Sequence, residues 1–331
     1  MVKVVPDGPV PPRASLLLIA YNQEDTVAAA IEGALSQTYA PLEIIISDDA
    51  STDRTFEVAE RTVEGYAGPH TVHLRRNPSN LGISAHLSLL AGQSTGELLF
   101  VAAGDDISLP GRCEEVVGMW LAHDRKPDLI ATDLCDLDAN GQVHDVIEVT
   151  DLGPYKTFDD WANNRPHVVG AAHTWARRLF DTFGYMEAGI YGEDQIMTFR
   201  AIVSGGALTL RKPLVKYRRG GLSRKRKWKS PEEYVARFRL ANRNGLGETR
   251  QLIHDAELAG VGEKMRALLA RKSAREQYVN GAFGAASLNT RLALMLRSHD
   301  VSIGFRLRVF MYATCPSLYK PFFFVKWHLR R

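Results

Sequence analysis

The chain has 331 residues, of which 45% are hydrophobic and 24% are charged, and its formal net charge is +3. This length suffices for one large domain or two smaller ones, and the composition excludes a disordered or fibrous chain. No segment reaches the ~18 continuous apolar residues that a membrane-spanning helix needs.

Strands and helices alternate over the first hundred residues. Three mainly apolar runs predict buried strands, namely ASLLLIA, LEIIISDDA and ELLFVAA, and TVHLRR predicts a further strand between the last two. Apolar residues spaced three or four apart predict helices between them, over 24–37, after the cap Ser51-Thr52-Asp53, and in ISAHLSLLAG. This alternation predicts an α/β fold with a mostly parallel sheet and helices on both faces.

The remaining elements are less regular. A helix is expected over 111–123, and Asn140-Gly141 predicts the turn of a β-hairpin. The segment YGEDQIMTFRAIVSG reads as a short helix that begins with acids, and ALTLRKPLVKYRRGG as one or two strands. From about residue 222 the chain is basic and helical.

Polar and charged side chains stand where the first four strands end. They are Tyr21-Asn22, Asp48-Asp49, Arg75-Arg76 and Asp105-Asp106. Because the carboxyl ends of parallel strands lie at one edge of a sheet, and ligands bind there, we expect a binding site at this edge.

Three pairs of acids are candidates for chemistry, and each also has a structural explanation. Asp105-Asp106 could hold Mg²⁺ or Mn²⁺ on a phosphate-bearing substrate, or could form a turn or cap a helix. Asp48-Asp49 could accept hydrogen bonds from a base or ribose, or could cap the next helix. Glu193-Asp194 begins a helix, where acids also meet the helix dipole favourably.

The order of these motifs over residues 13–220 resembles the family 2 glycosyltransferases of the GT-A fold, of the kind that build bacterial cell-surface polysaccharides. The resemblance is carried by ASLLLIAYNQEDTVAAAIEGALSQTYAPLEIIISDDASTDRT, by NLGISAHLSLLAGQSTGELLFVAAGDDISLP and by VVGAAHTWARRLFDTFGYMEAGIYGEDQIMTFRAIVSGG. It implies a nucleotide-sugar-binding and catalytic domain over 13–220, followed by a basic helical region over 221–331.

The resemblance also implies a role for individual residues. The donor nucleotide sugar, of the UDP or dTDP type, would be bound by Ala20, Tyr21, Asn22, Asp48, Asp49, Arg75 or Arg76, and Asp105. Asp105 and Asp106 match the region that binds Mn²⁺ or Mg²⁺. Asp194 matches the catalytic base, with Glu193 as its support, in an inverting transfer of one sugar to a hydroxyl of a glycan or lipid-linked glycan.

The chain departs from the family pattern at two points. The first acid of the D-x-D motif falls at Ala103, so one ribose contact is lost or moved to Asp106. The stretch YRRGGLSRKR lacks the histidine that completes the metal site in many relatives, so an arginine could take part of its role. A catalytically silent GT-A subunit is therefore the alternative. A nucleotidyltransferase would need a glycine-rich phosphate loop, and IAYNQEDT has none.

The charge is divided unevenly along the chain. Residues 1–210 have 14 Lys and Arg against 30 Asp and Glu, whereas residues 211–331 have 27 against 8. The basic run RKRKWK (224–229) reads as a solvated surface, and we expect no nucleic-acid partner. The aromatic and basic segment 301–331 fits either an anionic membrane surface or a terminal helix packed in a core. We expect membrane-surface contact and allow for a homo-oligomer.

The cysteines and the first residues bear on location. Cys113, Cys135 and Cys315 are far apart and predict neither a zinc site nor a disulfide framework. The first residues, MVKVVPDGPVPPRAS, have prolines where a secretion signal needs an apolar core. We therefore expect a cytoplasmic protein at the inner face of the membrane.

Overall fold

The computed structural model describes residues 10–218 and 230–315, which form two compact units. One unit comprises the described residues up to 186 together with 193–218, and the other comprises 187–192 and 230–315. The predicted boundary between 220 and 221, the basic run 224–229 and the segment 316–331 lie outside the described residues.

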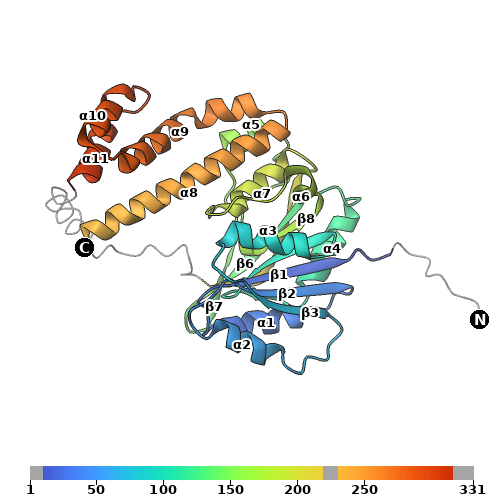
Figure 1. Cartoon of the computed structure of the whole chain (residues 1–331). Coiled ribbons are helices and arrows are strands. Elements are labelled where there is room, and N and C mark those ends of the chain that lie inside the picture. The colour runs from blue at the N-terminus through green and yellow to red at the C-terminus, as the bar shows by residue number, and fades with distance from the viewer. Residues whose placement is uncertain (1–9, 219–229, 316–331) are drawn as a thin grey trace, which may run out of the picture. The chain divides into compact units, whose positions relative to one another are not determined.

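The first unit is built on one mixed sheet with the strand order β3-β2-β1-β4-β8-β6-β9-β5, and β7 pairs with β6 (Figure 1). Its strands are β1 (Ala14–Ala20), β2 (Leu42–Asp48), β3 (Thr71–Arg76), β4 (Leu98–Ala103), β5 (Ile107–Ser108), β6 (Leu129–Leu137), β7 (Val143–Ile147), β8 (His173–Ala176) and β9 (Ala207–Arg218). The first four strands are mutually parallel, as predicted. β8 runs antiparallel between β4 and β6, and Asn140-Gly141 does form the turn of the β6–β7 hairpin.

Helices cover both faces of this sheet, which confirms the predicted fold class. They are α1 (Val27–Leu35), α2 (Thr55–Val63), α3 (Ile83–Gln93), α4 (Arg112–Ala122), α5 (Phe158–Asn163), α6 (Arg178–Phe183) and α7 (Glu193–Ile202), with a short 3₁₀ turn, η1 (Gly170–Ala172). β1 and β2 are buried at every position because α1 and α2 lie on one face of the parallel strands and α3 on the other (Figure 1).

The second unit contains α8 (Pro231–Leu258), α9 (Gly262–Gly284), α10 (Leu288–Arg297) and α11 (Ile303–Thr314). Ser230 caps α8 by accepting a hydrogen bond from the Glu233 N–H at 3.1 Å. Tyr278 and Val279 of α9 pack with Val309 of α11 in a small apolar core. Over 303–314 the chain is therefore a packed helix. Among the described residues, none of the helices combines the length and apolarity needed to cross a bilayer.

Candidate functional site

The register of the parallel strands brings their carboxyl ends into line. Ala20 at the end of β1 lies opposite Asp48 at the end of β2, and Asp48 lies opposite Arg76 at the end of β3. On the other side of β1, Ile19 pairs with Ala103, so β4 ends at the same edge. The polar groups predicted to meet at one edge of the sheet therefore do so.

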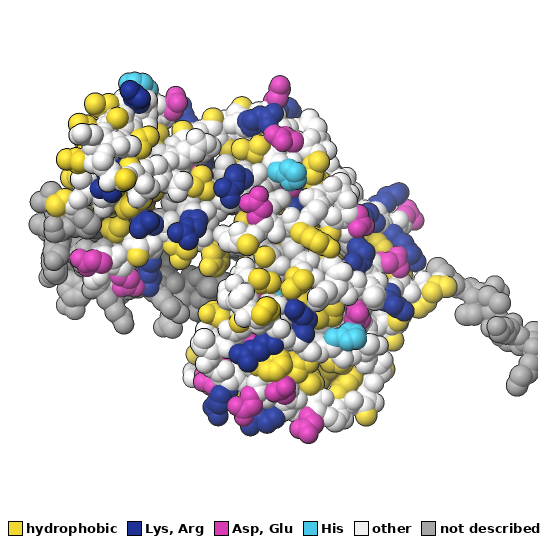
Figure 2. All heavy atoms as spheres, viewed as in Figure 1, with side chains coloured by type: hydrophobic (Ala, Val, Ile, Leu, Met, Phe, Trp, Pro, Cys, Tyr) yellow, Lys and Arg dark blue, Asp and Glu magenta, His cyan; other side chains and the backbone are white. Residues whose placement is uncertain are grey.

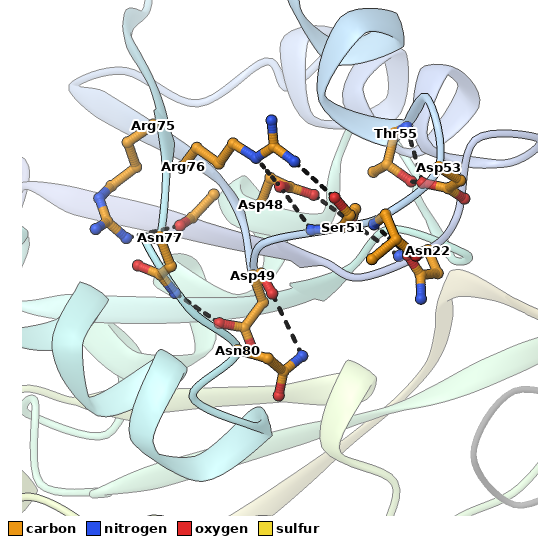
Figure 3. Close-up of polar contacts among 12 residues, drawn as sticks. Asn22, Asp48, Asp49, Ser51, Asp53, Thr55, Arg75, Arg76, Asn77 and Asn80 are labelled. Carbon is orange, nitrogen blue, oxygen red and sulfur yellow. Dashed lines mark hydrogen bonds and ion pairs between the residues drawn. The ribbon is translucent and has the colours of Figure 1, made fainter.

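Asp48 forms an ion pair with Arg76, whose side chain is half-exposed. Its buried carboxylate lies 3.0 Å from Arg76 Nε and accepts hydrogen bonds from the backbone N–H and the hydroxyl of Ser51 (Figure 3). Arg76 also donates to the Ser51 carbonyl at 2.6 Å and lies over the Phe56 ring. Asp48 thus fixes the turn after β2 and orients Arg76. The adjacent residue, Asp49, has different partners.

Asp49 anchors the loop that follows β3. Its buried carboxylate accepts hydrogen bonds from Asn77 Nδ2 at 2.7 Å and from the backbone N–H groups of Leu81 and Gly82 at 2.9 Å each. Asn80 donates to the Asp49 carbonyl at 3.3 Å (Figure 3). Gly82 has a φ of 75°, a conformation that suits glycine. The Asp49 side chain therefore organises one wall of the strand-end edge.

We expect Asp49→Ala to lower the free energy of unfolding by about 3 kcal/mol, because three donors lose a charged acceptor. Urea unfolding followed by tryptophan fluorescence measures the change, since Trp120, Trp161 and Trp175 are all buried in the sheet unit. Asp145→Ala, on exposed β7, is the control and should change stability by less than about 0.5 kcal/mol. Equal stability of the two variants would contradict the anchoring role.

Arg75 and Arg76 project to opposite sides of β3 (Figure 3). Arg75 donates to the hydroxyl of Ser47 at 2.7 Å, and burial lowers the pKa of its guanidinium. Arg76 instead points toward Asp48. The two arginines therefore have different surroundings, a distinction that the sequence left open.

The turn after β1 presents an aromatic ring. Asn22 has a φ of 52°, which asparagine tolerates better than most residues, and its N–H donates to Ser51 Oγ at 2.9 Å. Tyr21 precedes it and is 46% exposed. Ala20 is buried, and its carbonyl accepts a hydrogen bond from the Asp49 N–H at 2.9 Å. Tyr21 and Asn22 are thus both accessible in this turn, and Tyr21 provides its aromatic ring.

Asp105 and Asp106 form a pair whose negative charge is incompletely balanced. Burial raises the pKa of both carboxyl groups, and the charge of Asp105 raises that of Asp106 further. Arg218, at the end of β9, donates its backbone N–H to Asp106 Oδ1 at 2.8 Å and its Nε to the Asp105 carbonyl at 3.3 Å. Its charge lowers both pKa values without cancelling the effect of burial.

Arg112 is a second cation whose charge acts on this pair, and its role was not predicted from the sequence. Its side chain is fully buried and donates to the Val101 carbonyl and Ser108 Oγ at 2.9 Å and to the His173 carbonyl at 3.1 Å. Burial lowers its pKa to about 10, so it stays charged at neutral pH, and this charge lowers the pKa of Asp106. The sequence does carry a signal for this buried cation, because Arg112 lies on the apolar face of the helix expected over 111–123.

The acid pair supplies oxygen atoms of the kind that divalent cations bind. Within 10–218 and 230–315, no cluster of three or more His, Cys, Asp or Glu side chains could hold a metal ion. Asp105 and Asp106 therefore offer two carboxylates at most. Mg²⁺ and similar ions are commonly held by one or two carboxylates together with substrate phosphates, which agrees with the chemistry of this pair.

Glu193 and Asp194 begin α7 and differ in burial. Glu193 is buried, and this burial together with the charge of Asp194 raises its pKa to about 8. Its Oε2 lacks a hydrogen-bond partner among the described residues. Gly170 leaves room for it, since a Cβ there would lie 2.5 Å from Glu193 Oε1. Asp194 is partly exposed and accepts a hydrogen bond from the Gln195 N–H at 2.7 Å. Glu193 therefore adds little negative charge beside Asp194 at pH 7.

One short segment contacts the acids of α7 and the buried cation whose charge acts on Asp106. Gly170, in η1, lies against Glu193, and the carbonyl of His173, at the start of β8, accepts a hydrogen bond from Arg112. Arg112 is in turn the buried cation beside Asp106. Residues 170–173 thus connect the acids at the end of β4 with those at the start of α7.

The raised pKa of Glu193 predicts a pH-dependent effect on stability. Between pH 4.5 and about 8 the folded protein keeps a proton on Glu193 that the unfolded chain releases, so stability falls as pH rises. One such proton changes the free energy of unfolding by at most about 1.4 kcal/mol per pH unit. Glu193→Gln should remove this slope, so its advantage in urea denaturation should grow from pH 5 to 8 and then level off. A constant difference would contradict the raised pKa.

The fold defines the class of protein, which is GT-A. The UDP-GlcNAc complex of residues 1–349 of Staphylococcus aureus TarS superposes with a TM-score of 0.54, at 15% identity, over 91% of each chain. The family model described as "Glycosyl transferase family 2" matches residues 15–180, and the chain belongs to this family.

Curated relatives are similar over part of their length. The putative glycosyltransferase EpsE of Bacillus subtilis is 34% identical over 130 residues, which is 39% of this chain and 46% of EpsE. The Escherichia coli protein WfaP, a UDP-Glc:α-D-GlcNAc-diphosphoundecaprenol β-1,3-glucosyltransferase, is 51% identical over 47 residues, or 14% of this chain and 19% of WfaP. The chain thus spans less than half of either relative in these matches.

Proposed function

We propose that this protein is an inverting glycosyltransferase that moves one sugar from a UDP- or dTDP-sugar to a hydroxyl of a glycan or lipid-linked glycan. The observation that carries the proposal is the presence of two acid pairs, Glu193-Asp194, which lies against Gly170, and Asp105-Asp106, which is linked to the same segment through Arg112. Family membership and the names of EpsE and WfaP support the reaction class and the kind of acceptor.

Donor binding is assigned to the strand-end edge. The exposed Tyr21 ring offers a surface on which the base can stack, while Asp48 and Asp49 hold the surrounding turns. Asp105 and Asp106 would hold Mn²⁺ or Mg²⁺ against the diphosphate. When bound, the cation stabilises the negative charge that develops on the leaving nucleoside diphosphate.

Proton removal is assigned to Asp194. The acceptor hydroxyl must lose its proton as it attacks the anomeric carbon, and a partly exposed carboxylate within hydrogen-bond reach can accept it. Because the hydroxyl attacks from the face opposite the leaving group, a single displacement inverts the anomeric configuration. Glu193, largely protonated at pH 7, supports the start of α7 without competing for the proton.

A catalytically silent subunit is not favoured, because both acid pairs are retained despite Ala103.

Thermal unfolding with UDP, dTDP and GDP, each with and without Mn²⁺, tests the donor assignment, since a ligand that binds only the folded protein raises its Tm. We expect UDP or dTDP with Mn²⁺ to give the largest increase. A Tm that no nucleotide changes would overturn the donor site, and the responding nucleotide selects sugars for a transfer assay.

A further inference from the structure

Two helices of the second unit are apolar on their outer as well as their inner sides. Six large side chains, spaced four residues apart on each helix, are 42% to 57% exposed: Leu288, Leu292 and Leu296 on α10, and Ile303, Leu307 and Met311 on α11. We call them the α10–α11 stripes. Figure 2 shows hydrophobic side chains at the surface of the lobe that holds these helices.

The stripes are not the side by which these helices fold. α10 buries Met295, and α11 packs Val309 against α9 and Tyr312 against α8 and α9. Soluble monomers seldom expose so many large apolar side chains close together, and such surfaces usually contact a partner or a membrane.

Hydrogen bonds hold both helices in place. Arg291 of α10 donates to the carbonyls of Ala282 and Ala285, near the end of α9, at 3.2 and 3.0 Å. Arg306 of α11 donates to the Met295 carbonyl at 2.5 Å. The stripes are thus presented by a preformed surface.

The charge of this region identifies the occupant. The described residues 288–315 contain four arginines and one acid, Asp300. Arg297 and Arg308, next to the stripes in sequence, are exposed. A second copy of the chain meeting this surface about a two-fold axis would set like charges against each other. Anionic phospholipid offers the opposite charge together with an apolar layer for the leucines.

We propose that the α10–α11 stripes and their arginines dock the protein on an anionic membrane surface, with the helices lying in the lipid headgroup layer. Both helices are too short to cross a bilayer, having 10 and 12 residues. On docking, the apolar side chains of the stripes become buried in the lipid layer, and the arginines favour anionic over zwitterionic lipid.

Flotation with lipid vesicles tests this assignment on the full chain, without donor or acceptor, so the outcome does not depend on the transferase assay. We expect binding to phosphatidylcholine vesicles that contain about one quarter phosphatidylglycerol, weaker binding to pure phosphatidylcholine, and loss of binding at high salt. The double variant Leu292→Gln/Leu307→Gln should bind about tenfold less.

The control is Leu258→Gln/Leu268→Gln, which changes two equally exposed leucines on α8 and α9 and should bind like the wild type. Circular dichroism and Tm establish that both variants are folded. Absence of wild-type binding, or equal binding by the two variants, would overturn the proposal. So would a dimer by light scattering that the stripe variant converts to a monomer while vesicle binding persists.

Discussion

Asp194→Asn should lower kcat for sugar transfer by about 100- to 10,000-fold while leaving donor affinity within about twofold of the wild type. The amide keeps the size of the side chain but cannot accept the hydroxyl proton. Glu193 is a poor substitute base, because its carboxyl group is buried, and this burial still raises its pKa when the charge of Asp194 is removed. Initial rates at saturating donor and acceptor, together with nucleotide titration, measure the two quantities.

The control for this variant is Asp159→Asn, which makes the same change in the first turn of another helix, α5. It should leave kcat unchanged within about twofold, because the general effect of an acid on a helix dipole is small. If Asp194→Asn kept more than a third of the wild-type kcat with an unchanged pH profile, the proton acceptor would have to be another group.

Most of the parallel half of the sheet could be predicted because β1, β2 and β4 are mainly apolar runs. β1 and β2 are buried at every position, so their sequences are mainly apolar without strict alternation, and polar residues follow where each run ends. Parallel pairing then places Asp48, Arg76 and Ala103 at one edge whatever their separation in sequence. The position of the strand-end site follows from where the apolar runs end and from the parallel pairing of the strands.

The partners of the acids could not be predicted, because they come from residues that are distant in the sequence. Asp48 and Asp49 are adjacent, yet Asp48 pairs with Arg76, and Asp49 binds backbone N–H groups more than thirty positions further along the chain. Arg218 meets Asp106 only because β9 returns beside β5, a pairing that no local pattern encodes. Arg112 is placed likewise by β8, which is inserted antiparallel between β4 and β6.

The Asp105-Asp106 pair leads to an expectation in which stability and metal binding change in opposite directions. Both carboxyl groups have raised pKa values in the folded protein, so ionising them at pH 7 costs stability relative to the unfolded chain. Asp105→Asn removes one of the two charges and relieves the repulsion on Asp106. We expect this variant to be more stable than the wild type by about 1–2 kcal/mol at pH 7 without metal.

The same substitution should weaken Mn²⁺ binding at least about tenfold, because the two acids are the only carboxylates assigned to the ion. Mn²⁺ with UDP should then raise the Tm of the wild type and leave that of Asp105→Asn nearly unchanged. Electron paramagnetic resonance of free Mn²⁺ measures the affinity directly, and urea unfolding at pH 5 and pH 7 measures the stability. The stability advantage should shrink at pH 5, where the wild-type pair holds more protons.

Asp145→Asn, the same change at an exposed position, should alter neither the stability nor the Mn²⁺ affinity. A variant that lost stability yet bound Mn²⁺ like the wild type would show that Asp105 is a structural turn residue, and the metal assignment would be wrong.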